Sequence, residues 1–175
     1  MSDIIGENTV GSFTGSDNAG GYGHKNAAFL YTAVAGDTVQ ELFWHGGSTR
    51  GNQTLKMAIY TVVGGNPNFR ASAIVTVTVS GSSKIWYSGS LSSPFSLTAG
   101  TVYTICFGFT SGFYHTSFHI ALTSTSKHDF GGDLPILWIH SSNVGRRYAN
   151  YAIVTHAISD RKPGIIGDGL RSPID

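Results

Sequence analysis

The stretch 85–109, IWYSGSLSSPFSLTAGTVYTICFGF, constrains the fold of this chain more than any other. It opens with the aromatic pair Trp86-Tyr87, bends at Pro94 and turns at Gly100 before a second alternating run. Runs of period-2 alternation separated by Gly and Pro are typical of β-strands joined by tight turns. We therefore expect two strands of a β-sandwich here, forming a hairpin that sets the strand register.

Similar runs recur along the chain, roughly every ten residues, as in sandwich and barrel folds. They lie at 27–34, 38–44, 54–63, 70–80, 118–123, 134–140 and 148–158, with a short candidate at 9–13. Since no segment keeps an apolar 3.6-residue period, we expect no long helix. The pattern predicts an all-β fold, an antiparallel β-sandwich, with a jelly roll favoured and an immunoglobulin-like Greek key as the alternative. The expected core residues are Leu42, Trp44, Leu55, Met57, Ile59, Val75, Val77, Val79, Leu97, Tyr103, Ile105, Phe107, Ile120, Leu122 and Ile153.

The composition divides the chain into an N-terminal arm (1–26), a β-sandwich domain (27–158) and an extended C-terminal arm (159–175). Both arms are rich in Gly and polar residues, yet each carries spaced aliphatic side chains. Such arms can become ordered by burying apolar area on a neighbouring subunit. The candidate assembly residues are Ile4, Ile5, Ile165, Ile166, Leu170 and Ile174.

Low charge limits the possible partners. Charged residues make up 12% of the chain, and the formal net charge of +1 is too small to capture nucleic acid or an anionic membrane electrostatically. No apolar run is long enough for a transmembrane helix, and the first residues lack the pattern of a signal peptide. We expect no nucleic-acid partner, no membrane insertion and no signal peptide. The single cysteine, Cys106, lies in an apolar run and is expected to be buried.

The sequence offers little catalytic chemistry. The seven histidines form no H-E-x-x-H motif, no G-x-S-x-G occurs, and no pair of carboxylates stands out. His45, His128 and Asp129, in expected loops, are the alternative for a metal site. We expect a non-enzymatic protein with no catalytic residues, no metal and no cofactor.

The order of motifs from residue 38 to about residue 158 resembles a known group of modules. MAIYT is followed by GGNP, then by the WY pair, and then by the turn motif LTAGTVY. This order resembles the non-catalytic β-sandwich modules of phage tail or virion proteins and of bacterial surface proteins. The resemblance implies adhesion, sugar binding or structural assembly. Within the turn motif, Gly100 can supply a positive φ, and the Tyr103 hydroxyl can bond back across the turn, as in a tyrosine corner.

Two functions follow as hypotheses. The first is a structural virion protein of a phage, either a capsid-decoration, a head-fibre or a tail-associated protein. Such a protein would be made in the host cytoplasm, be located in the virion, and assemble through its arms with other virion subunits as a homo-oligomer. The alternative is a carbohydrate-binding or host-receptor-binding adhesin module, with a host surface glycan as partner.

Sugar binding needs an aromatic platform and polar groups beside it. The aromatic candidates are Trp44, Trp86, Tyr87, Trp138, Tyr148 and Tyr151, and the polar candidates are Arg50, Asn52, Gln53 and Asn150. Because large aromatic residues dominate β-sandwich cores, we expect Trp44 and Trp86 to be buried. The candidate glycan-binding residues are therefore Trp138, Arg50, Asn52 and Tyr148.

Overall fold

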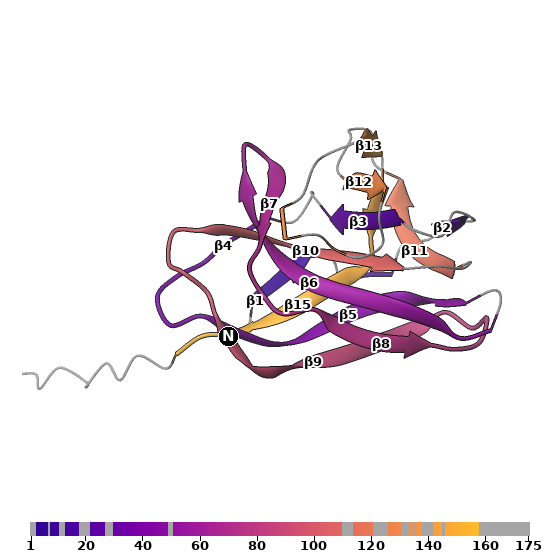
Figure 1. Ribbon diagram of the computed structural model, residues 1–175, viewed down its shortest axis with the longest axis horizontal. Helices are drawn as coiled ribbons and strands as arrows, with labels where there is room; N and C mark the ends of the chain where they lie inside the picture. Colours follow the sequence, from indigo (N-terminus) through magenta and orange to yellow (C-terminus); the bar gives the residue numbers. More distant parts are fainter. Residues whose placement is uncertain are drawn as a thin grey trace, which may run out of the picture.

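The fold is seen in a computed structural model of the chain (Figure 1). The structure describes residues 3–6, 8–10, 13–17, 22–26, 30–48, 51–109, 114–120, 126–130, 134, 136–137, 142–144 and 146–157. Within 13–17, 22–26, 114–120, 126–130, 142–144 and 146–148 the description covers the backbone.

The described strands form two antiparallel sheets. In spatial order, the first sheet contains β1 (Asp3–Gly6), β15 (Asn150–Thr155), β5 (Thr38–Ser48), β11 (Tyr114–Ile120) and β14 (Arg146–Tyr148), with β9 (Ile85–Ser96) on β5 and β2 (Phe13–Asp17) on β11. The second sheet contains β13 (Ser142–Val144), β12 (Ser126–Phe130), β3 (Tyr22–Asn26), β10 (Val102–Phe109), β6 (Gln53–Val63) and β7 (Asn66–Arg70), with β4 (Tyr31–Thr32) on β10 and β8 (Val75–Val79) on β6. The antiparallel β-sandwich predicted from the sequence is confirmed, and the described residues contain no helix that could span a membrane.

The stretch 85–109 connects the two sheets instead of forming a hairpin. β9 pairs with β5 in the first sheet, whereas β10 pairs with β6, β3 and β4 in the second. The backbone between β9 and β10 is hydrogen-bonded to the loop of residues 33–37, which connects β4 to β5. The Leu97 N–H donates to the backbone carbonyl of Asp37 (2.9 Å), and the Gly100 N–H donates to the carbonyl of Ala33 (2.8 Å). The hairpin prediction is therefore wrong, because these bonds to the 33–37 loop direct the chain across the sandwich.

The turn itself is built as the sequence predicts. Gly100 has a φ of 78°, in the left-handed region that favours glycine. The Thr98 N–H donates a hydrogen bond to the Tyr103 hydroxyl at 3.0 Å. Leu97 and Tyr103 are both part of the main core, so side-chain packing and this hydrogen bond together fix the turn.

The main core lies between the sheets and contains most of the residues expected there. The confirmed members are Leu42, Trp44, Leu55, Met57, Ile59, Val75, Val79, Leu97, Tyr103, Ile105 and Phe107, with Val77 partly buried against them. The prediction for Ile153 is wrong, since it is 38% exposed while its neighbours Ala152 and Val154 are buried. Ile153 lies opposite Ile4 on the outer side of the first sheet. Leu122 and the side chain of Ile120 lie outside the described residues.

The middle of β6 and most of β10 are buried on both faces. Their inward side chains join the main core, while Ala58, Tyr60 and Cys106 point the other way into a second cluster with Leu134. The segment that carries Leu134 is held to the edge of the second sheet, where Arg70 N–H donates to the Ile136 carbonyl at 2.8 Å. This cover explains why Cys106 is buried, as predicted.

The first 26 residues, assigned to an arm from the sequence, contribute three strands to the sheets. β1 pairs antiparallel with β15, β2 pairs with β11, and β3 lies between β10 and β12. Ile5 has no exposed surface and belongs to the chain's own core, whereas Ile4 is partly exposed on the opposite side of β1. In this conformation Ile5 is not available to a neighbouring subunit. Ile165, Ile166, Leu170 and Ile174 lie outside the described residues.

Candidate functional site

An outward-facing group of rings lies on the first sheet, across β5, β9 and β15. We call it the aromatic face and define it as Phe43, His45, Trp86 and Tyr151. Alternation along β5 buries Leu42 and Trp44 and turns Phe43 and His45 to the other side. Tyr151 is directly opposite Phe43 on β15, and Trp86 is directly opposite His45 on β9, so all four side chains leave the sheet on one side.

The rings of the aromatic face form a row in space, in which each ring contacts the next. Phe43 and Tyr151 are stacked, with ring centroids 4.5 Å apart and an angle of 4° between the ring planes. Trp86 meets Tyr151 edge-on at 5.1 Å and meets His45 edge-on at 5.0 Å. Phe43, Trp86 and Tyr151 remain partly exposed, so their rings can be reached from solvent.

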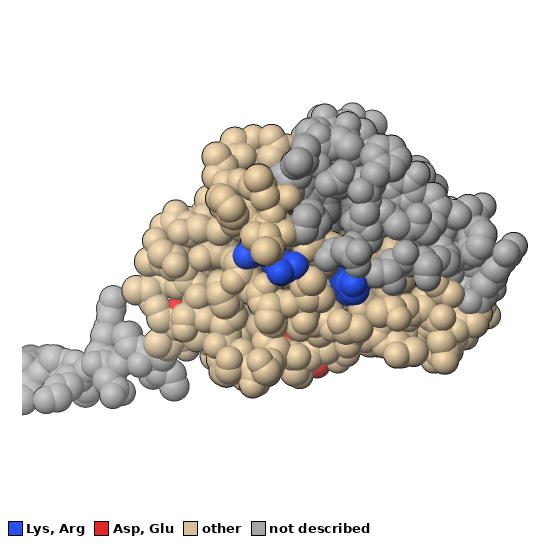
Figure 2. Space-filling model, viewed as in Figure 1, with Lys and Arg blue, Asp and Glu red and all other residues tan. Residues whose placement is uncertain are grey.

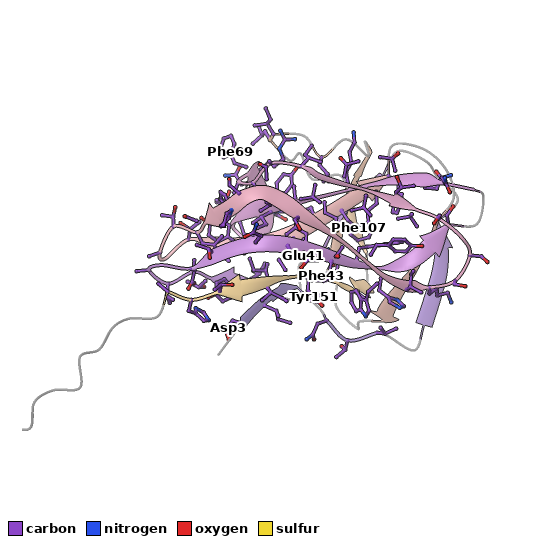
Figure 3. The ribbon with its side chains drawn as sticks, turned by 90° about the horizontal axis from the view of Figure 1, so that it is seen from below. Asp3, Glu41, Phe43, Phe69, Phe107 and Tyr151 are labelled. Carbon is purple, nitrogen blue, oxygen red and sulfur yellow. The ribbon has the colours of Figure 1, made fainter. Side chains whose placement is uncertain are left out.

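Polar groups flank these rings. Glu41 precedes Phe43 by two residues on β5 and therefore lies on the same side; Figure 3 shows Glu41, Phe43 and Tyr151 together, away from Phe69. Ser88 and Ser90 are the β9 partners of Phe43 and Glu41, and both are exposed. The aromatic face thus carries one carboxylate and two hydroxyls next to its stacked rings.

The electrostatics of the face follow from burial and from these neighbours. Burial, followed by the charge of Glu41, raises the pKa of the Tyr151 hydroxyl, which stays protonated at neutral pH. Burial, followed by the charge of Lys84, lowers the pKa of His45 below its ordinary 6.5. His45 is therefore neutral at pH 7, and Glu41 is the charged group beside the Phe43–Tyr151 stack.

The sequence-predicted glycan residues are placed differently. Asn52 is exposed in the connection between β5 and β6, and the backbone of Tyr148 belongs to β14, opposite Phe118. Nothing in the described part of the chain brings either to the aromatic face. Arg50, Trp138 and the side chain of Tyr148 lie outside the described residues.

The aromatic candidates named from the sequence separate into core and surface. Trp44 is fully buried, as predicted, and Tyr87 packs against the core while its hydroxyl donates to the Ser80 carbonyl at 2.6 Å. The prediction that Trp86 fills the core is wrong, because its position opposite His45 turns it outward. Trp86 and Tyr151 thus remain as members of the platform.

Glu41, Phe43 and His45 were missed as members of this site. Simple alternation from residue 38 places Val39 on the same side as Glu41 and Phe43, yet Val39 is buried in the core. The register of β5 shifts between Val39 and Glu41 against β9, and between Val39 and Leu42 against β15, which reverses the alternation near Gln40. Counting backwards from the buried Trp44 would have identified the outward residues.

A separate buried polar network closes one end of the sandwich. Asp37 has no exposed surface and accepts hydrogen bonds from the Tyr31 hydroxyl (2.6 Å) and the Val34 N–H (2.7 Å). Its other oxygen lies 2.7 Å from His156 Nδ1, and Nε2 of the same ring lies 3.4 Å from the Asp3 carboxylate. The network links β1, β15 and the 33–37 loop, which indicates a structural role.

Metal and acid–base chemistry find little support among the described residues. Within that part of the chain, no group of three or more His, Cys, Asp or Glu side chains is arranged to hold a metal ion. A groove of about 300 Å³ beside the Pro94 bend is lined by Ala73 and residues 91–96, which carry hydroxyls and apolar groups but no titratable side chain. On the side shown in Figure 2, both Lys and Arg and Asp and Glu form only small separate spots on the described surface.

Comparison with known proteins adds fold-level similarity. No protein-family model and no curated protein sequence matches the chain. The chain is similar to the crystal structure of the cysteine protease and lectin-like domains of Cwp84, a surface layer associated protein of Clostridium difficile, with a TM-score of 0.60 and 10% identity over 89% of this chain and 36% of that chain. It is also similar to clostridial cysteine protease Cwp84 after propeptide cleavage, with a TM-score of 0.56 and 9% identity over 89% of this chain and 40% of that one. At these identities the likeness shows the fold, and the chain spans well under half the length of either protein.

Proposed function

We propose that this protein is a non-enzymatic carbohydrate-binding module and that the aromatic face is its glycan-binding site. The observation that carries the proposal is the stacked, partly exposed Phe43–Tyr151 pair with the Glu41 carboxylate beside it. The similarity to a protein with a lectin-like domain supports the same class of function.

The chemistry of the face suits a sugar ring. One side of a pyranose presents C–H groups that pack on an aromatic ring, and burying this contact removes apolar surface from water. The hydroxyls around the ring need hydrogen-bond partners, and a carboxylate accepts from two of them. Binding sites combine such an aromatic surface with a few placed polar groups, which is the arrangement of Phe43, Tyr151 and Glu41.

The test is a glycan array probed with the wild-type protein and with Tyr151→Ala. We expect the wild type to bind at least one glycan class and Tyr151→Ala to lose about tenfold or more in affinity, because about 1.4 kcal/mol of ring contact is removed. Tyr151→Phe keeps the ring and should bind like the wild type.

The matched control is Phe69→Ala. Phe69 is 53% exposed on β7 of the second sheet, so its removal deletes an exposed aromatic ring away from the face. Circular dichroism would check that each variant folds. Glycan binding that survives Tyr151→Ala but falls with Phe69→Ala would contradict the proposed site.

The virion role predicted from the sequence remains a second hypothesis. It rests on low charge and on terminal segments with spaced aliphatic residues, and its location in a phage particle stays a prediction. An oligomer or particle that depends on residues 160–175, together with an array that gives no glycan hit, would favour it over sugar binding.

A further inference from the structure

The charge around the aromatic face is asymmetric. Glu41 lies beside the Phe43–Tyr151 stack, close enough to act on the Tyr151 hydroxyl. The nearest described cation on this side is Lys84, which comes directly before Ile85, the β9 residue opposite Gly46. At about 3.3 Å per strand residue, Lys84 is roughly 13 Å along the sheet from Phe43 and 20 Å from Glu41. That separation exceeds the Debye length of about 8 Å at physiological salt, so Lys84 does not offset Glu41 at the stack.

The remaining polar groups near the stack are neutral. His45 is uncharged at pH 7 and buried, and Ser88 and Ser90 are exposed residues with hydroxyls on the neighbouring strand. An ionised carboxylate accepts hydrogen bonds but cannot donate them, whereas hydroxyls do both. A ligand on the stack therefore needs hydroxyl donors for Glu41, and a ligand carboxylate would face a like charge.

Building on the proposed function, we infer that the aromatic face binds neutral glycans, whose hydroxyls donate to Glu41, and discriminates against glycans that carry uronate or sialic acid. Glu41 is then the specificity-determining residue of the site, while the Phe43–Tyr151 stack supplies most of the contact area.

Matched oligosaccharide pairs test this inference. One pair is β-1,4-mannohexaose and the β-1,4-mannuronate hexamer, which differ at C6 alone; the other is N-acetyllactosamine with and without a terminal sialic acid. We expect the wild-type protein to bind the neutral member of a pair at least tenfold more tightly than the acidic member. In Glu41→Gln one amide oxygen still accepts from a hydroxyl, but the negative charge is lost. We therefore expect the neutral member to bind more weakly than to the wild type, the acidic member no longer to be repelled, and the gap between them to close to about threefold.

Asp3→Asn is the matched control. It removes one negative charge from the same sheet, but Asp3 lies three residues along β1 from Gly6, the residue opposite Tyr151. The variant should therefore leave the difference in affinity between neutral and acidic glycans unchanged. Wild-type protein that binds acidic members as tightly as neutral ones, or a gap that persists in Glu41→Gln, would overturn the inference. If the wild type binds glycans without this discrimination and Tyr151→Ala still loses the binding, the proposed function stands and the inference alone fails. Binding to no glycan would overturn both.

Discussion

Asp37 shows how one buried acid can hold three parts of this chain. Burial by itself would raise the pKa of its carboxyl group, but the hydrogen bonds from Tyr31, the Val34 N–H and His156 outweigh that effect and keep the pKa below 3.8. The backbone carbonyls of the loop that contains Asp37 also accept hydrogen bonds from the turn after β9. The residue therefore couples the loop, β15 and the crossing between the two sheets.

We predict that Asp37→Asn is destabilised by about 2–3 kcal/mol at neutral pH, because buried donors lose a charged acceptor. The lowered pKa sets the pH dependence of stability. The contribution of the Asp37 carboxylate to the free energy of unfolding is fully present above the pKa of the unfolded chain, 3.8, and is lost as the pH falls through the lower pKa of the folded state. Urea unfolding of both proteins between pH 2 and 7 would measure it. A difference in unfolding free energy that stays constant down to the lowest pH would show that the carboxylate charge does not matter.

At the scale of the element, β9 is shaped by the strand that packs beneath it. Gly89 lies opposite Leu42 and so faces inward, toward β8 of the other sheet. A Cβ at this position would clash with Val75 Cγ1 and would lie 2.8 Å from Val77 Cγ2. The absence of a side chain here lets β8 and β9 approach closely.

We expect Gly89→Ala to lower the free energy of unfolding by about 1–3 kcal/mol through overpacking. Adding Val75→Ala should relieve part of that loss, so the double variant should be more stable than the sum of the single changes predicts. Ser88→Ala, on the exposed side of the same strand, is the control and should change stability by less than about 0.5 kcal/mol. Thermal and urea unfolding would measure the four variants and the wild type, and strict additivity would argue against the contact.

The same elements show what the sequence could and could not predict. The turn at Gly100 with its Tyr103 bond was predictable, since a positive φ and a nearby hydroxyl are local requirements. The pairing partners of β9 and β10 were not, because the backbone bonds that send them to different sheets come from the distant 33–37 loop.

Only part of the candidate site could be predicted from the sequence, for a similar reason. Trp86 and Tyr151 could be named from residue type alone, but grouping them with Phe43 required the cross-strand register and the bulge at Gln40. Period-2 alternation assigns faces only while a strand stays in register, and one extra residue reverses the assignment. Ile153 was misassigned because the same alternation does not say which of the two faces is inward.

At the scale of the whole molecule, the N-terminal strand completes the sandwich. β1 starts beside the end of β15 (Figure 1). Asp3 approaches His156 there, and Ile5 lies in the core between the sheets. A strand at the edge of a sheet is also the element that two copies of a chain could exchange. Whether β1 belongs to its own sandwich or to a neighbour's bears directly on the assembly hypothesis.

Ile4 and Ile5 offer a matched pair for that question. Ile5→Ala empties a fully buried position and should cost about 2–5 kcal/mol of unfolding free energy, whereas Ile4→Ala, on the partly exposed side, should cost about 1 kcal/mol or less. Because β1 packs within its own chain, the urea midpoint of the wild type should be the same at 1 and 100 μM protein, two concentrations chosen to span roughly the range in which a weak dimer would form. A midpoint that rises with concentration in the wild type, and loses that dependence in Ile5→Ala, would show instead that β1 is exchanged between copies and that the N-terminal segment does act as an assembly arm.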